Sequence, residues 1–112
     1  MMKIEAIIKP FKLEEVQAAL TGLGVQDVVI SGVVGGEGRL GSQTFYRGAE
    51  YRVNAPRMKL EILVSSLHVD EVVDAVSLAA RTTAADDDGV ILVSEVAEAI
   101  NIRDGRALRT PR

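Results

Sequence analysis

The chain contains two copies of one pattern, and this internal repeat limits the folds that it can adopt. With Met2 placed over Met58, the segments MKIEAIIKPFKLEEVQAAL and MKLEILVSSLHVDEVVDAV align without gaps. Lysine, glutamate and aliphatic residues fall at matching places. Further on, VVISGV from Val28 aligns with ILVSEV from Ile91, after seven additional residues, TTAADDD, in the second copy. The shared periodicity, charges and serine predict two similar supersecondary units rather than a chance likeness.

Each copy is predicted to form a strand, a helix and a second strand. Alternating apolar and charged residues in KIEAIIK predict the first strand, which ends at Pro10 because proline cannot donate to a ladder. The segment 13–23 has an apolar helical face and acidic residues in its first turn, with Gly24 just past its end. A strand over 27–34 follows. The second copy repeats the pattern with a strand at 59–64, a helix from Val69 onward and a strand at 90–96.

Two such copies predict a ferredoxin-like βαββαβ fold of the α+β class, with both helices on one face of a four-stranded antiparallel sheet. We interpret the 112 residues as one domain: repeat one (2–34), a long loop (35–56), repeat two (58–96) and a C-terminal segment (97–112). Ile7 and Leu63 occupy equivalent positions opposite the helices, and the strands near 28–34 and 90–93 are apolar on both sides. An uncovered apolar face predicts burial against other copies of the chain in a closed homo-oligomer.

The composition excludes several classes of protein. The chain is 47% hydrophobic and 26% charged, which is typical of a globular domain, and its net charge of -3 gives no electrostatic case for nucleic acid or an anionic membrane. It has no cysteine, so disulfide scaffolds and thiol chemistry are excluded. No segment is long and apolar enough to span a bilayer, and the first residues lack the apolar core of a signal peptide. We therefore expect a cytoplasmic protein with no membrane insertion.

Several motifs have chemical interpretations that the sequence does not favour. GEGRLG at 36–41 matches a dinucleotide-binding pattern, but no helical periodicity follows it to receive a pyrophosphate. The only histidine, His68, lacks the partners of a zinc site or a catalytic triad and is interpreted as a solvated residue before a helix. The aspartates at 86–88 have the chemistry for a hard cation but are typical of a solvated turn. We expect a mobile charged tail, with phosphate contact as the alternative, from Arg103, Arg106, Arg109 and Arg112.

The loop at 35–56 is long for so small a chain, and long irregular loops in compact domains are usually functional or disordered. It begins with glycines and then concentrates two phenols, a guanidinium and a carboxylate within 46–51. Such a segment suits docking to a partner protein better than catalysis, which needs rigidly held groups.

The segments MKIEAIIKPFKLEEVQAAL and YRGAEYRV resemble the PII nitrogen-regulatory signal proteins, and the resemblance extends from Met2 to about Arg103. It implies a homotrimer and a non-enzymatic signal transducer. It also implies that ATP or ADP binds in clefts between subunits and that 2-oxoglutarate is sensed through an Mg-ATP complex. The extended T-loop of the family corresponds to residues 35–56 and docks onto membrane transporters, enzymes and regulators. Tyr51 matches the tyrosine that proteobacterial members uridylylate.

The resemblance also assigns site residues, with no metal ligand and no catalytic residue among them. The positions that correspond to the nucleotide or effector cleft are Ile7, Gly38, Arg39, Glu61, Leu63, Gly89 and Arg103. Contacts with a partner are expected from Arg39, Arg47, Glu50 and Tyr51 of the T-loop.

The chain departs from the family where phosphate would bind. The family's loop reads T-G-x-x-G-D-G-K, whereas the stretch from Thr82 to Val90 has lost two of the glycines and carries Val90 in place of the lysine. Phosphate loops supply backbone N–H groups and a cation, so this loss weakens the case for a triphosphate. Asn101 replaces one of two tail arginines, and Leu40 aligns with the glutamine that helps to ligate Mg and 2-oxoglutarate.

We therefore expect a PII-like regulator that senses ADP or AMP rather than Mg-ATP with 2-oxoglutarate and that controls a transporter or an enzyme. One alternative is a PII-like regulator of inorganic-carbon or metal transport that has lost ATP binding. Another is a metal-binding trimer of similar fold that uses the aspartates. A small enzyme is disfavoured, because the sequence has no cysteine, one histidine and no paired carboxylates at convincing spacing.

Overall fold

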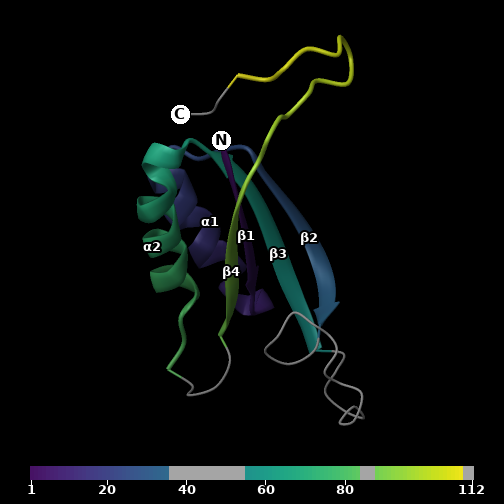
Figure 1. Ribbon diagram of the computed structural model, residues 1–112. Helices are drawn as coiled ribbons and strands as arrows, with labels where there is room; N and C mark the ends of the chain where they lie inside the picture. The colour runs from purple at the N-terminus through teal and green to yellow at the C-terminus, as the bar shows by residue number, and fades with distance from the viewer. Residues whose placement is uncertain (36–54, 84–87, 110–112) are drawn as a thin grey trace.

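The computed structural model describes residues 1–35, 55–83 and 88–109. Its elements, in chain order, are β1 (Met2–Ile8), a 3-10 turn η1 (Pro10–Lys12), α1 (Leu13–Gly22), β2 (Val28–Gly35), β3 (Ala55–Val64), a 3-10 turn η5 (Ser66–His68), α2 (Val69–Ala80) and β4 (Gly89–Glu95). The four strands form one sheet in the order β2-β3-β1-β4, and each neighbouring pair is antiparallel (Figure 1). This arrangement confirms the predicted ferredoxin-like α+β fold.

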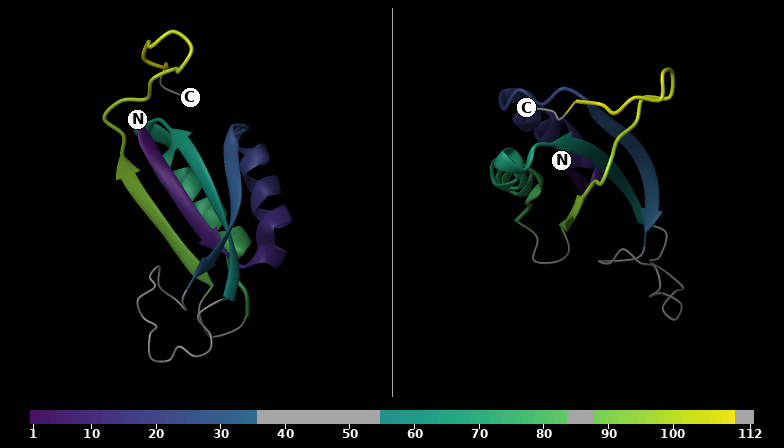
Figure 2. Two further views of the ribbon diagram at one scale, coloured as in Figure 1. Left: turned by 90° about the vertical axis from the view of Figure 1, so that its right-hand side faces the viewer. Right: turned by 45° about the horizontal axis from the view of Figure 1, so that its top comes forward.

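Both helices cover the same face of the sheet, as the repeat predicted (Figure 2, left). The core lies between these two layers. In β1, burial alternates along the strand, so every second side chain points toward the helices. The buried core residues are Ile4, Ala6 and Ile8 of β1, Leu60, Ile62 and Val64 of β3, Val16 and Leu20 of α1, and Val72, Val76 and Ala80 of α2.

The repeat is visible in the hydrogen-bond register. The two central strands pair so that Glu5 lies directly opposite Glu61, and these are equivalent positions of the two copies. A side-chain contact recurs as well: Lys12 Nζ lies 3.0 Å from Glu15 Oε1 in the first copy, and His68 Nδ1 lies 3.0 Å from Glu71 Oε1 in the second. The two halves of the chain are therefore related by an approximate two-fold rotation through the centre of the sheet.

The T-loop is shorter at both ends than the sequence predicted. Gly35, Ala55 and Pro56, which were placed in the loop, belong to strands, because β2 and β3 stay paired as far as Gly35 and Ala55. Pro56 is tolerated there because β1 pairs with β3 only from Met58 onward. At Pro56, β3 has no neighbour on the β1 side, so the missing N–H costs no hydrogen bond to β1. Residues 36–54 of the T-loop lie outside the described residues.

The C-terminal segment forms a hairpin over residues 99–108, rather than the irregular tail that the sequence suggested. The N–H of Asn101 donates to the carbonyl of Arg106 at 2.9 Å, and that of Leu108 donates to Ala99 at 2.8 Å. Gly105 adopts a φ of 69°, which lets the chain reverse. Figure 1 shows this hairpin, in yellow, beyond the end of the sheet where β1 begins.

Candidate functional site

The sheet face opposite the helices, called the open face below, carries three of the predicted effector residues. Ile7 of β1 and both Glu61 and Leu63 of β3 alternate with buried neighbours, so all three point away from the helices. Ile7 lies directly opposite Lys59 on one side and Val90 on the other. The fold therefore places Ile7, Glu61 and Leu63 on the same face of two adjacent strands, where Leu63 lies opposite Lys3, four residues along β1 from Ile7.

The centre of the open face is a compact network of charges. Glu5 and Glu61 face each other across the strands, a like-charge arrangement that is unfavourable by itself. Lys3 Nζ lies 3.2 Å from Glu61 and 3.5 Å from Glu5, and Lys59 Nζ lies 3.7 Å from Glu5. The hydrogen bond from Lys3 lowers the pKa of Glu61 below its usual value, and the same bond raises the pKa of Lys3. The two lysines thus offset the repulsion between the two glutamates.

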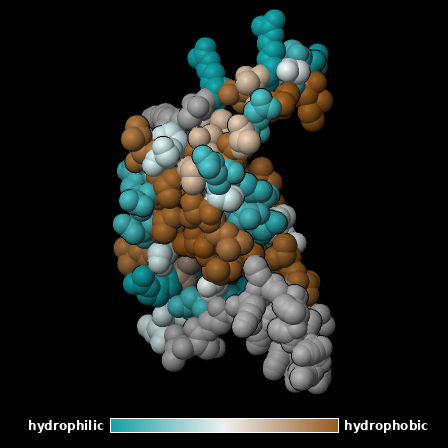
Figure 3. All heavy atoms as spheres, in the orientation of Figure 1, coloured by the Kyte–Doolittle hydropathy of each residue, from teal (hydrophilic) through white to brown (hydrophobic). Residues whose placement is uncertain are grey.

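The apolar part of the open face surrounds this charged centre. Val29 on β2 is 61% exposed and Leu92 on β4 is 40% exposed, and they lie opposite Glu61 and Glu5 respectively. Figure 3 shows apolar side chains gathered over the middle of the molecule, where β4 runs. The expected apolar face is therefore mixed, because each copy of the repeat places a lysine and a glutamate at its centre.

Gly89 marks the end of the sheet at which β1 ends and β4 begins. Its φ is +121°, a region that side chains rarely adopt, and a Cβ built there would lie 2.0 Å from the carbonyl oxygen of Ile7. Only glycine allows the backbone of β4 to approach β1 so closely. This contact places two predicted effector residues, Ile7 and Gly89, beside each other.

Asp88, directly before Gly89, contacts Thr82 and Lys9. Its carboxylate accepts hydrogen bonds from the backbone N–H of Thr82 at 3.2 Å and from the Thr82 hydroxyl, and Lys9 Nζ lies 3.6 Å away. These contacts, chiefly the Thr82 hydroxyl, lower the pKa of Asp88. Asp86 and Asp87 lie outside the described residues. Within the described ranges, no three histidine or carboxylate side chains gather as metal ligands would.

Arg103 is far from Gly89 within one chain. Gly89 begins β4, whereas Arg103 lies in the hairpin beyond the other end of that strand (Figure 1). A single effector could therefore contact both of these predicted cleft residues only if they came from two copies of the chain. The remaining predicted site residues lie outside the described residues: Gly38, Arg39, Arg47, Glu50 and Tyr51.

Two cavities lie near predicted site residues. The larger, of about 930 Å³, runs under the hairpin and is lined on the open face by Lys3, Glu61 and Leu63 and on the hairpin by Leu108 and Arg109. The other, of about 240 Å³, lies between the end of α2 and the start of β4 and includes Arg81, Asp88 and Gly89. Sequence analysis missed the contribution of Arg81 and Leu108, because neither belongs to a motif and the distant segments meet only in three dimensions.

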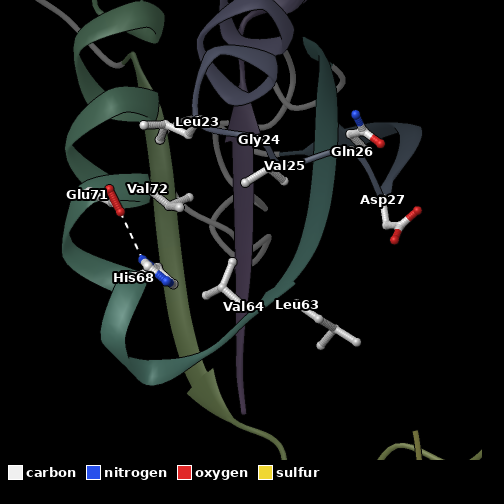
Figure 4. Close-up of a pocket in the computed structure, with 10 residues that line it drawn as sticks. All are labelled: Leu23, Gly24, Val25, Gln26, Asp27, Leu63, Val64, His68, Glu71 and Val72. Carbon is white, nitrogen blue, oxygen red and sulfur yellow. Dashed lines mark hydrogen bonds and ion pairs between the residues drawn. The ribbon is translucent and has the colours of Figure 1, made fainter. Parts of the chain in front are cut away.

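A further cavity, of about 270 Å³, lies where α1 ends and α2 begins (Figure 4). Its wall is apolar at Leu23, Val25 and Val72, and its polar groups include His68 and Glu71. The side chain of His68 is 45% exposed and contacts Glu71 one turn into the helix. This placement agrees with the interpretation of His68 as a solvated residue before a helix.

The fold and its charged sheet face define a small ferredoxin-like protein with one long loop between two repeats. Residues 1–106 match the family described as nitrogen regulatory protein P-II. The chain is 44% identical to the nitrogen regulatory protein P-II of Bradyrhizobium diazoefficiens and 43% identical to the nitrogen regulatory protein GlnK of Escherichia coli K12, with 96% of each chain covered. It is 42% identical to the P-II protein of Rhodospirillum rubrum, with 94% of each chain covered. The chain belongs to the P-II nitrogen regulatory protein family.

Membership of this family fixes the general role of the chain. P-II proteins are signal transducers and not enzymes, and they are trimers that regulate transporters or enzymes. They bind adenine nucleotides. In the part of the chain that the structure describes, neither helix has the length and apolar character needed to cross a bilayer.

Proposed function

We propose that this chain is a cytoplasmic trimeric regulator that binds ADP or AMP between its copies and controls a transporter or an enzyme through its T-loop. The observation that carries the proposal is the placement of Ile7, Glu61 and Leu63 on the open face, while Arg103 projects beyond the opposite end of β4. A nucleotide on the open face of one copy would meet the Arg103 guanidinium of a neighbour, so assembly would complete the site.

The composition of the open face supports assembly. Val29 and Leu92 expose apolar surface next to a charged network whose side chains are only about one-fifth to one-third exposed. A second copy that covered Val29 and Leu92 would remove their apolar surface from water. The lysines and glutamates of the network already pair within the chain, so burying them would leave no charge without a partner. In a closed ring, the open face of every copy is covered in the same way.

The preference for ADP or AMP is inferred from the charges near Gly89 and in the C-terminal hairpin. Val90 lies where the family has a lysine, Asn101 replaces one arginine of the tail, and Asp88 contributes a negative charge. Each additional phosphate adds negative charge that this site compensates poorly. We infer that Mg-ATP and 2-oxoglutarate are weaker effectors here than ADP or AMP.

We propose that effector binding is communicated to the partner protein through the T-loop. Arg47, Glu50 and Tyr51 are the proposed contacts with the partner, and Tyr51 is the proposed site of uridylylation. An effector changes the loop only if it binds one loop conformation more tightly than another. β2 ends and β3 begins at the same end of the sheet as the start of β4, with β1 lying between β3 and β4. A ligand near Gly89 would therefore lie at the end of the sheet where the loop joins β2 and β3.

A thermal-shift panel of ATP, ADP, AMP, 2-oxoglutarate, bicarbonate and divalent cations tests the proposal. A ligand at about one hundred times its Kd stabilises the folded state by about 2.7 kcal/mol, which raises Tm measurably. We expect ADP or AMP to raise Tm more than Mg-ATP does. A response to bicarbonate or to metal ions alone would replace this proposal with the alternative regulators of inorganic-carbon or metal transport.

A further inference from the structure

Two of the cavities are equivalent in the repeat, and their charges differ. Val64 and Asp27 line the cavity in Figure 4, and their counterparts in the opposite copy of the repeat, Ile8 and Val90 respectively, line the cavity beside Gly89. Asp27 and Glu71 give the Figure 4 cavity two carboxylates, which disfavour an anion. The cavity beside Gly89, called the Gly89 cavity below, has Arg81 instead. Of these two equivalent cavities, only the Gly89 cavity suits a phosphate.

Arg81 is held in place at this cavity by its own helix. It follows directly after α2, and its Nη2 donates a hydrogen bond to the Ser77 hydroxyl at 3.2 Å, one turn earlier. A guanidinium carries several N–H donors in a planar fork, so this single bond leaves other donors for an anion. Arg81 also offsets the partial negative charge of the α2 C-terminus.

Asp88 would repel an anion in this cavity unless its charge were compensated. Lys9 supplies an ammonium 3.6 Å from the Asp88 carboxylate, and Thr82 donates two hydrogen bonds to it. Lys9 therefore offsets the charge of Asp88, and Arg81, which lines the cavity, remains as the cation for one phosphate group. One such cation suits the short phosphate chain of ADP or AMP better than a triphosphate.

We propose that Arg81 binds a phosphate group of the adenine nucleotide in the Gly89 cavity, in place of the lysine that Val90 has replaced. This inference rests on the proposed function. The Gly89 cavity, of about 240 Å³, is smaller than most sites that hold a complete ligand. The phosphate end of the nucleotide would therefore enter the cavity, and the nucleoside would stay outside it. The cavity lies on the helix side of the sheet at the start of β4, whereas Ile7 lies on the open face. Because β4 is an edge strand, a nucleotide would reach from the open face to this cavity around the edge of β4.

Calorimetry on the full-length protein with ADP and with adenosine tests the proposal. We expect Arg81→Ala to weaken ADP binding by about tenfold or more, since a charge-assisted contact is lost, and to leave adenosine binding unchanged. Arg81→Lys should restore part of the ADP affinity. Adding Val90→Lys to the Arg81→Ala variant should also restore it, because a cation returns next to the same cavity.

The matched control is Lys12→Ala, which removes a cation from the turn after β1, where it pairs with Glu15. It should leave the ADP affinity unchanged. Equal losses for ADP and adenosine in Arg81→Ala would indicate a structural effect and overturn the assignment, as would an unchanged ADP affinity. If the unmodified protein binds neither ADP nor AMP, the proposed function itself fails, and the inference fails with it.

Discussion

At the scale of single residues, Gly89 is the position at which the backbone is most constrained. Family resemblance assigned Gly89 to the nucleotide cleft, and the structure gives a physical reason for glycine there. The residue combines a φ of +121° with a close approach to the Ile7 carbonyl. Neither condition is visible in the sequence, because both depend on how β4 meets β1 across more than eighty residues of chain.

Replacing Gly89 with alanine should lower the free energy of unfolding by about 2 kcal/mol or more, since strain at an unfavourable φ adds to the clash with β1. Urea denaturation at a fixed protein concentration measures this loss. Gly32→Ala is the matched control, because Gly32 lies within β2 and a Cβ there meets nothing within 4 Å. Equal stability of the two variants would show that β4 can move away from the Ile7 carbonyl at little cost in free energy.

At the scale of elements, the end of α1 shows how much local sequence determines. The N–H of Val25 donates to Leu20 and that of Gly24 to Thr21, which is a Schellman cap, and Gly24 has a φ of 83°. This cap was predictable from the sequence, because its hydrogen bonds span only a few residues. The start of β3 was predicted too late, because residues 55–58 extend the strand through pairing with β2, which is distant in sequence.

Gly24→Ala should destabilise the protein by about 1 kcal/mol, because an alanine in the left-handed region places its Cβ against the backbone. Gly22→Ala, two residues earlier in the last turn of α1, should be neutral or slightly stabilising, since a Cβ there meets nothing within 4 Å. Thermal unfolding of the pair, followed by circular dichroism, compares them. A Tm for Gly24→Ala at or above that of Gly22→Ala would contradict the role of the cap.

At the scale of the whole molecule, the open face is the surface through which copies of the chain are proposed to meet. Its charges pair within one chain, while Val29 and Leu92 remain exposed on the outer strands β2 and β4. The sequence predicted an apolar face from its aliphatic residues. It did not predict that Lys3 bridges both glutamates, because Glu5 and Glu61 become neighbours only when the two repeats pair.

Val29→Glu should reduce the oligomer from three copies to one, because a carboxylate would be buried at the interface without a partner. Light scattering should give a mass near three times 12.0 kDa for the unmodified chain and near 12.0 kDa for the variant. Leu67→Glu is the control, since Leu67 is 87% exposed in the turn before α2. A monomeric unmodified protein at micromolar concentration would remove the basis of the proposed inter-subunit site.

The sequence alone determined the two-fold repeat, the type of each element, the helix-facing core and the family, because these depend on periodicity, local hydrogen bonds and matching motifs. Tertiary structure decided which distant residues became neighbours: Glu5 with Glu61, Gly89 with Ile7, and Arg81 with the start of β4. It also separated Arg103 from Gly89. These relations arise from strand register and helix packing, which bring together positions that no local pattern connects.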